Sequence, residues 1–154
     1  GLMMTPTGPK VLEYNTRFGD PETQVLITRL ETDPVKIMLA AAKGKLGEIN
    51  VKVKDEYAMV VVLAAEGYPN SYRKGDPISF PDSMGDKQFI FHAGTKADEA
   101  GNIVTNGGRV LGVTALGANL PEARDKAYEL SDRVDYKSKY LRRDIGAKEL
   151  ARTE

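Results

Sequence analysis

Apolar residues recur at helical spacing over residues 35–46. The stripe consists of Val35, Met38, Leu39, Ala42 and Leu46. A Thr-Asp-Pro start signal precedes it at residues 32–34, and Gly44 and Gly47 follow as stop signals. The pattern therefore predicts an amphipathic helix over this part of the chain.

A different pattern begins after residue 50. Tyr57–Ala65 is almost continuously apolar, which indicates a buried strand. Three further extended segments follow at Gln88–Thr95, Ile103–Thr105 and Arg109–Ala115. The Asn106–Gly108 corner supplies glycines where a hairpin needs positive φ, so an antiparallel meander is predicted.

A third helix is predicted from Asn119, with one face packed on this sheet. The packing residues would be Ala123, Ala127, Leu130 and Val134. A short terminal helix is expected from about Ala147. Because the period changes within residues 47–55, we predict two modules, residues 1–50 and 51–154. The second should be α+β, a mainly antiparallel sheet with a covering helix.

Alternation near the amino terminus predicts a strand at Lys10–Asn15, with Glu13 and Asn15 on one face. Mg²⁺ prefers hard oxygen ligands and is commonly shared between one or two protein groups and nucleotide phosphates. A carboxylate and an amide oxygen fit that demand, and Arg17 has the parity to stabilise phosphate or a developing acyl phosphate beside them. On spacing alone, an exposed edge strand could carry the same residues without any metal.

A helix start follows the strand. Asp20 is predicted as the N-cap, Pro21 as the first helical residue and Glu22 as a carboxylate beside the positive helix end. This helix should continue to about Leu30.

Composition and charge exclude several classes of function. With 41% hydrophobic and 29% charged residues, the chain has the composition of a globular protein. Its 22 basic and 22 acidic residues create no net field toward nucleic acid or an anionic membrane. It has no cysteine for disulfides or thiolate chemistry, and its apolar runs are far shorter than the ~20 residues that span a bilayer. We expect a soluble, cytoplasmic protein.

Residues 12–24, LEYNTRFGDPETQ, resemble the E-x-N-x-R-F-G-D-P-E-x-Q segment of phosphoribosylamine-glycine ligases, members of the ATP-grasp superfamily. The wider superfamily keeps only E-x-N-x-R. FHAGT at residues 91–95, VTNGGRVL at 104–111 and RDIG at 143–146 are similar to the carboxy-terminal domain of the same ligases. The resemblance covers residues 1 to about 146.

The resemblance implies site roles. Glu13 and Asn15 match the ligands of Mg²⁺ or Mn²⁺, and Arg17 matches an arginine near the transferred phosphate. Asp20 and Glu22 match motif positions to which no individual role is assigned. The implied substrates are ATP, glycine and 5-phosphoribosylamine, joined through an acyl phosphate in purine biosynthesis.

The resemblance also implies that this chain is incomplete. Residues 1–50 would be the end of an ATP-grasp subdomain, a strand plus two helices, and residues 51–154 the carboxy-terminal domain. The glycine-rich phosphate loop and the adenine pocket would lie before Gly1. The chain alone is therefore expected to be inactive. Family members in fungi and animals are fused to further purine enzymes, so the parent could be multifunctional.

Other candidate residues have simpler explanations. His92 is the single histidine, and since no acid or nucleophile is tied to it, a structural role is favoured. The Asn106–Arg109 corner could present N–H groups and a guanidinium to phosphate, but a hairpin turn is favoured. The basic tail around Arg142 and Arg143 is interspersed with acidic residues and indicates a solvated face rather than a nucleic-acid strip.

Two alternative functions remain open. The chain could come from another ATP-grasp ligase or carboxylase, or it could be a non-catalytic interaction module. The motif extension at residues 17–24 favours the ligase, because biotin-dependent carboxylases follow the shared triad with a different string.

Overall fold

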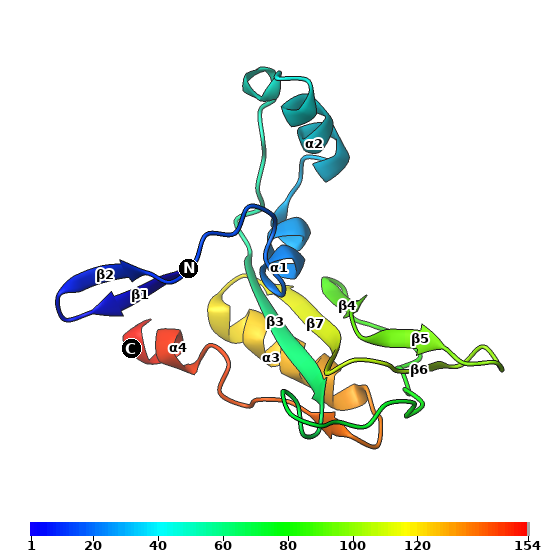
Figure 1. The fold of residues 1–154 in the computed structure, drawn as a ribbon. Helices are drawn as coiled ribbons and strands as arrows, with labels where there is room; N and C mark the ends of the chain where they lie inside the picture. Colours follow the sequence, from blue (N-terminus) through cyan, green and yellow to red (C-terminus); the bar gives the residue numbers. More distant parts are fainter. Residues whose placement is uncertain (154) are drawn as a thin grey trace.

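A four-stranded antiparallel sheet in the order β4-β7-β3-β8 lies at the centre of the chain (Figure 1). The structure is a computed structural model and describes residues 1–153. The strands are β3 (Tyr57–Ala65), β4 (Gln88–His92), β7 (Arg109–Gly117) and β8 (Lys139–Tyr140). β3 and β7 pair along their whole length and form the middle of the sheet, and the predicted strand at Tyr57–Ala65 is confirmed.

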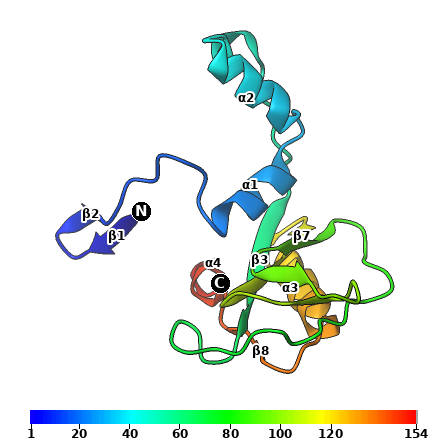
Figure 2. The ribbon, with the colours of Figure 1, turned by 45° about the vertical axis from the view of Figure 1, so that its right-hand side comes forward.

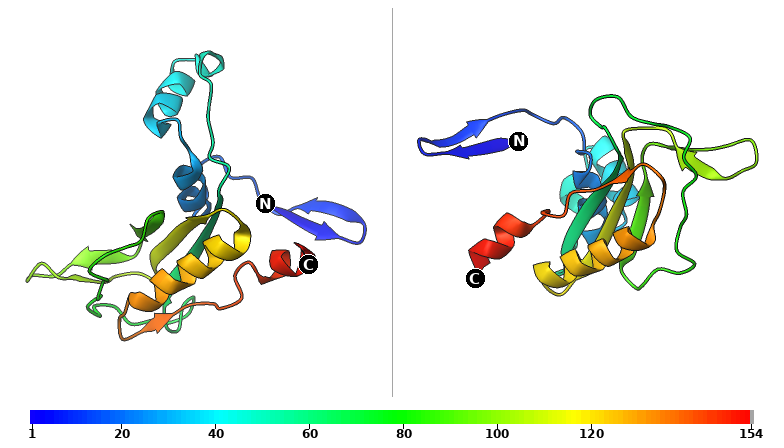
Figure 3. Two further views of the ribbon diagram at one scale, coloured as in Figure 1. Left: turned by 180° about the vertical axis from the view of Figure 1, so that it is seen from behind. Right: turned by 90° about the horizontal axis from the view of Figure 1, so that it is seen from below.

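Helices cover the β3–β7 pair from opposite sides (Figure 3). The helix α3 (Leu120–Arg133) lies on one face, and α1 (Glu22–Arg29) lies on the other. Asn119 caps α3, since its side chain accepts a hydrogen bond from the backbone N–H of Glu122 at 2.9 Å. The predicted covering helix is confirmed, and its four predicted packing residues are fully buried.

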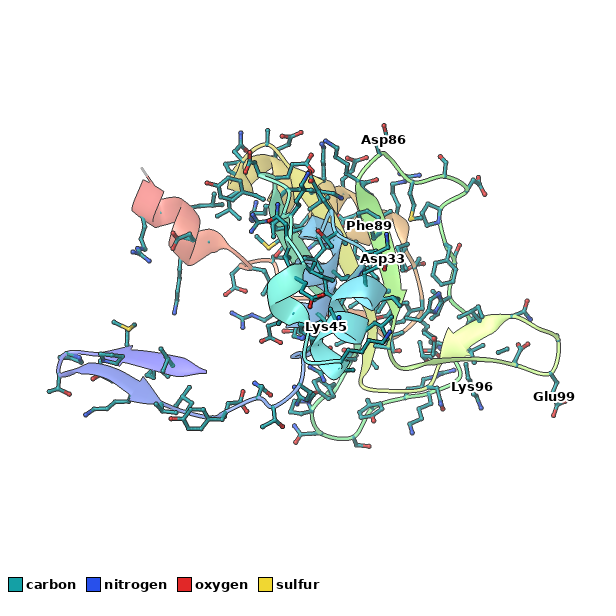
Figure 4. All side chains as sticks on the ribbon, turned by 90° about the horizontal axis from the view of Figure 1, so that it is seen from above. Asp33, Lys45, Asp86, Phe89, Lys96 and Glu99 are labelled. Carbon is teal, nitrogen blue, oxygen red and sulfur yellow. The ribbon has the colours of Figure 1, made fainter. Side chains whose placement is uncertain are left out.

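The predicted meander is wrong. The strands β5 and β6 are Thr95–Ala97 and Ile103–Thr105. They pair with each other in a separate two-stranded sheet, while β4 pairs directly with β7. Asn106–Gly108 is therefore a connection between two sheets and not a hairpin turn. The hairpin turn lies at Asp98, whose carboxylate accepts from the backbone N–H of Asn102 at 2.8 Å, and Glu99 lies at its tip (Figure 4).

A separate hairpin forms the amino terminus and stands apart from the sheet (Figures 1 and 2). Its strands are β1 (Leu2–Thr5) and β2 (Gly8–Val11). The predicted strand at Lys10–Asn15 is therefore wrong beyond Val11. Within residues 1–153, no strand pairs with residues 12–15, so they form no ladder; Gly1 forms hydrogen bonds only with the backbone N–H of Leu12 and the carbonyl of Glu13, each at 2.9 Å.

The predicted amphipathic helix is present as α2 (Pro34–Ala42), followed by the short 3₁₀ helix η1 (Leu46–Glu48). Asp33 caps α2 by accepting from the backbone N–H of Val35 at 2.8 Å. The helix projects from the sheet (Figure 2). Its apolar stripe is largely exposed within residues 1–153. Val35 is 67% exposed, and Met38 and Leu39 are 51% exposed.

The start of α1 differs from the prediction. Pro21 occupies the N-cap position and the helix begins at Glu22, so Asp20 is not the cap. The backbone carbonyl of Gly19 instead accepts from the N–H of Thr23 at 3.0 Å.

The carboxy-terminal segment is fastened to α3 by Tyr128. The Tyr128 hydroxyl donates to the carbonyl of Arg142 at 2.8 Å and accepts from the N–H of Ile145 at 3.1 Å. Arg142 and Arg143 are exposed, as the predicted solvated face requires. The helix α4 is Ala147–Thr153. None of the helices formed by residues 1–153 combines the length and hydrophobicity that crossing a membrane requires.

Asp76 is a buried residue that joins three segments of the chain. Its Oδ1 lies 2.7 Å from Arg73 Nε, and its Oδ2 accepts from the backbone N–H of Ser138 at 3.1 Å. Its own backbone N–H donates to Thr105 Oγ1 at 3.1 Å. The Asp76 carboxylate therefore joins its own loop to the segment that leads into β8, and the Asp76 backbone joins that loop to β6.

Replacing Asp76 with alanine should destabilise the fold, because the buried N–H of Ser138 loses its acceptor. Leaving a buried donor unpaired costs about 1–3 kcal/mol, so the thermal midpoint should fall by several degrees. Thermal unfolding followed by circular dichroism measures the shift. Glu99→Ala, at the exposed tip of the β5–β6 hairpin, is the control and should change stability by less than about 0.5 kcal/mol. Equal midpoints for the two variants would contradict the linking role of Asp76.

Candidate functional site

The three residues predicted to bind metal and phosphate lie next to one another just after β2. Asn15 Nδ2 donates to Glu13 Oε1 at 3.3 Å, and Arg17 Nη1 donates to Asn15 Oδ1 at 2.8 Å. All three side chains are exposed. The structure thus brings Glu13, Asn15 and Arg17 together, although the strand that was expected to align them ends at Val11.

Arg17 shapes the segment between β2 and α1. The same Nη1 that contacts Asn15 also donates to the carbonyl of Phe18 at 3.0 Å. The guanidinium therefore folds back on its own stretch of chain and keeps the cluster compact. Its remaining N–H groups are free to contact an anion, because a guanidinium carries five donors.

The oxygen atoms of this cluster fit Mg²⁺ as a partial set of ligands. Glu13 offers a carboxylate and Asn15 an amide oxygen, and both are hard donors. Residues 1–153 contain no group of three or more His, Asp or Glu side chains placed to hold a metal. The remaining ligands would have to be phosphates, water or other protein groups. The donor set therefore suits a cation shared with a nucleotide, not a closed protein site.

An ion pair connects the end of this segment to the central sheet. Arg109 Nη2 lies 2.9 Å from Asp20 Oδ2, and Arg109 Nη1 donates to the Asp20 backbone carbonyl at 3.1 Å. The sequence favoured Arg109 as part of a turn, with phosphate binding as the alternative, and gave Asp20 no role beyond capping. The signal that could have indicated the pair is that both residues lie within the family-like strings.

Arg109 is positioned by a close crossing of two segments. The backbone N–H of Asn106 donates to the carbonyl of Gly94 at 2.7 Å, and the Gly94 N–H donates to the carbonyl of Arg109 at 2.9 Å. A Cβ atom on Gly94 would lie 2.5 Å from that Arg109 oxygen and 2.6 Å from Gly107 Cα. The crossing has no room for a side chain, so glycine is required at this point.

His92 does not join the cluster. Its Nδ1 lies 3.0 Å from Thr95 Oγ1, and its ring centroid lies 5.6 Å from that of Phe80. It borders a hollow of about 290 Å³ at the end of β4. These contacts support the structural role that the sequence favours.

Comparisons with known proteins agree on one family. Residues 58–148 match the family model described as phosphoribosylglycinamide synthetase, C domain. The chain is 51% identical over 148 residues to a phosphoribosylamine-glycine ligase of Caulobacter vibrioides, covering 95% of this chain and 35% of that protein. It is 50% identical over 147 residues to a bifunctional purine biosynthetic protein of Pichia angusta, covering 94% of this chain and 18% of that protein.

A solved structure gives the same result. The crystal structure of a phosphoribosylamine-glycine ligase from Thermotoga maritima aligns with a TM-score of 0.75 and 42% sequence identity. The alignment covers 94% of this chain and 35% of that one. The chain thus spans about a third of the length of the ligases that it matches.

The close approach of Gly94 to Gly107 and the Arg109 carbonyl can be tested by substitution. Gly94→Ala should lower stability by about 1–3 kcal/mol, the usual cost of forcing atoms into a packed site. Gly47→Ala is a matched control, because a Cβ there meets nothing within 4 Å and the backbone φ is not positive. Chemical denaturation gives both free energies of unfolding. A Gly94→Ala protein as stable as the Gly47→Ala protein would show that the crossing tolerates a side chain.

Proposed function

Because the chain belongs to the phosphoribosylglycinamide synthetase C-domain family, we propose that it is the carboxy-terminal part of a phosphoribosylamine-glycine ligase. The complete protein would join glycine to 5-phosphoribosylamine at the expense of ATP, giving ADP, phosphate and glycinamide ribonucleotide for purine biosynthesis. The observation that carries the proposal is that the Glu13–Asn15–Arg17 cluster and a matching C domain at residues 58–148 occur in one chain, in that order.

Each residue of the cluster has a part in the proposed reaction. Glu13 and Asn15 would hold Mg²⁺, or Mn²⁺, through their side-chain oxygens. When bound, this cation would neutralise charge on the phosphates of ATP. Arg17 would contact the transferred phosphoryl group and the acyl phosphate of glycine through its free N–H groups. The cluster is exposed here, so water would have to be excluded by other parts of the parent protein.

The uncovered apolar residues support an origin in a larger protein. Met38 of the α2 stripe lines a small apolar hollow together with Phe18 and Leu26, which are 56% and 50% exposed. Contiguous exposed apolar surface usually marks a contact with another structural unit. We infer that residues of the parent chain before Gly1 cover this surface, so that residues 1–50 complete an ATP-grasp subdomain and residues 51–154 form the carboxy-terminal domain.

The alternatives have less support. Another ATP-grasp ligase or carboxylase, or a non-catalytic module, would have to account for identities near one half with proteins named as this ligase. We propose a cytoplasmic enzyme, as for other steps of nucleotide synthesis that use soluble substrates. A fusion to a further purine enzyme is compatible with the bifunctional name of the Pichia angusta relative.

The isolated 154-residue chain should be inactive, because the groups that hold ATP and the ribosyl phosphate are proposed to lie elsewhere. Catalysis requires the reactants to be held together, and two oxygen ligands cannot organise Mg²⁺ alone. Ligation is measured as glycinamide ribonucleotide formed, and nucleotide binding by calorimetry. Product above a no-protein control, or micromolar affinity for Mg-ATP, would mean that the chain contains a complete site.

In the full-length protein, Glu13→Gln should lower kcat by roughly 100-fold, which corresponds to a loss of ~3 kcal/mol at the transition state. The change keeps the shape and one oxygen but removes the charge that balances the cation. Asn15→Leu should act similarly by deleting an oxygen ligand. Turnover at saturating Mg²⁺ is the measurement, with Glu99→Gln as the control.

His92→Gln tests the placement of the site in the same assays. It should change thermal stability more than turnover, because His92 contacts Thr95 and Phe80 and not the cluster. The site would be misplaced if Glu13→Gln retained near-normal turnover while His92→Gln abolished it without loss of stability.

A further inference from the structure

The contact between Arg109 and Asp20 fixes both position and orientation. Two nitrogens of one guanidinium contact the side chain and the backbone carbonyl of one residue, at 2.9 and 3.1 Å, across 89 positions of sequence. A planar guanidinium that uses two donors at once restricts the rotation of its partner. The contact therefore fixes the orientation of the Asp20 side chain and backbone relative to the sheet.

One end of this contact is rigid. Arg109 is the first residue of β7, and Val110 after it is fully buried. The Arg109 carbonyl accepts a hydrogen bond from the Gly94 N–H, where the chain at Gly94 crosses the chain at Gly107. No side chain fits at Gly94 in this crossing. The guanidinium thus extends from a fixed backbone.

Within residues 1–153, the other end has few contacts with the sheet apart from Arg109. Residues 12–20 follow a hairpin that stands apart from the sheet, and they form neither helix nor strand (Figure 1). Among the described residues, the Asp20–Arg109 contact is the one hydrogen-bonded link from this segment to the central sheet. Packing of α1 on the sheet begins only after it. Glu13, Asn15 and Arg17 all lie in this segment, before the Asp20–Arg109 contact.

We propose that Arg109 is a positioning residue that acts through Asp20 to place the Glu13–Asn15–Arg17 cluster for the ligase reaction. This inference rests on the function proposed above. It assigns to the C domain a part in aligning the cation and phosphate ligands that precede it in sequence. Asp20 accepts both hydrogen bonds from Arg109 and so connects the cluster segment to the sheet.

A positioning role and a purely structural role predict different effects on folding stability and on turnover. The side chains of Arg109 and Asp20 are 40% and 55% exposed, and an ion pair this accessible contributes little to folding stability. A displacement of about 1 Å at a reacting group can cost on the order of 100-fold in rate. Loss of the pair should therefore lower turnover strongly and leave the thermal midpoint almost unchanged.

The test uses the full-length protein with Arg109→Met, Asp20→Ala and the double variant. Arg152→Met is the matched control, because Arg152 also pairs with a carboxylate on an exposed surface, 3.0 Å from Glu149. Each single variant should lower kcat by about 10- to 100-fold, and the double variant should be no worse than the lower single one. The kcat of Arg109→Lys should lie between those of the wild type and Arg109→Met. The lysine ammonium keeps the charge but cannot donate through two nitrogens at once.

A second measurement does not depend on catalysis. Backbone ¹⁵N order parameters of residues 13–20 in the 154-residue chain should fall in both single variants, from near the rigid value of about 0.85 toward 0.6 or less. They should stay unchanged in Arg152→Met. Unchanged order parameters in Arg109→Met and Asp20→Ala would overturn the restraint.

Several kinetic outcomes would also overturn the proposal. Normal turnover of Arg109→Met, or multiplied losses in the double variant, would mean that the two residues do not act as a unit. A raised KM for one substrate in Arg109→Met, with normal kinetics in Asp20→Ala, would mean that Arg109 contacts substrate directly. A wild-type protein that forms no glycinamide ribonucleotide would overturn the proposed function instead, and the order parameters would still decide the restraint.

Discussion

The antiparallel pairing of β3 with β7 is the interaction on which the remaining structure depends. β4 attaches to β7, β8 attaches to β3, and α1 and α3 lie on opposite faces of the pair. Val61, Leu63 and Val113 are fully buried at its centre, and burying each such side chain stabilises the fold by about 1.5–3 kcal/mol. Because Arg109 begins β7, the same pairing also fixes the sheet residue that hydrogen-bonds to Asp20.

Features encoded within a few residues could be predicted from the sequence. The buried strand Tyr57–Ala65 and the capped starts of α2 and α3 follow from periodicity and from Asp33 and Asn119. Strand partners could not be predicted in this way. β4 pairs with β7 across an inserted hairpin, and β2 ends at Val11 although the alternation continues to Asn15.

In the candidate site, the local cluster was predicted from the sequence and the long-range contact was not. The resemblance to a ligase motif selected Glu13, Asn15 and Arg17, and the structure brings these three side chains together by hydrogen bonds within a short stretch of chain. The contact between Arg109 and Asp20 was missed, because the sequence around Asp20 was interpreted as the start of a helix with Asp20 as its N-cap. Only the folded sheet and the crossing at Gly94 bring the two residues into reach.

The separation of β3 and β7 in the sequence also bears on how the chain folds. Pairing them closes residues 66–108 into a loop, and the conformational entropy lost in that closure must be overcome before the buried contacts form. The β5–β6 hairpin lies inside the loop and needs only neighbouring residues, so it can form earlier. Since folding slows as contacts become less local, closure of this loop is the step expected to limit the folding rate, and the strands that are most stable at the end would be among the last to meet.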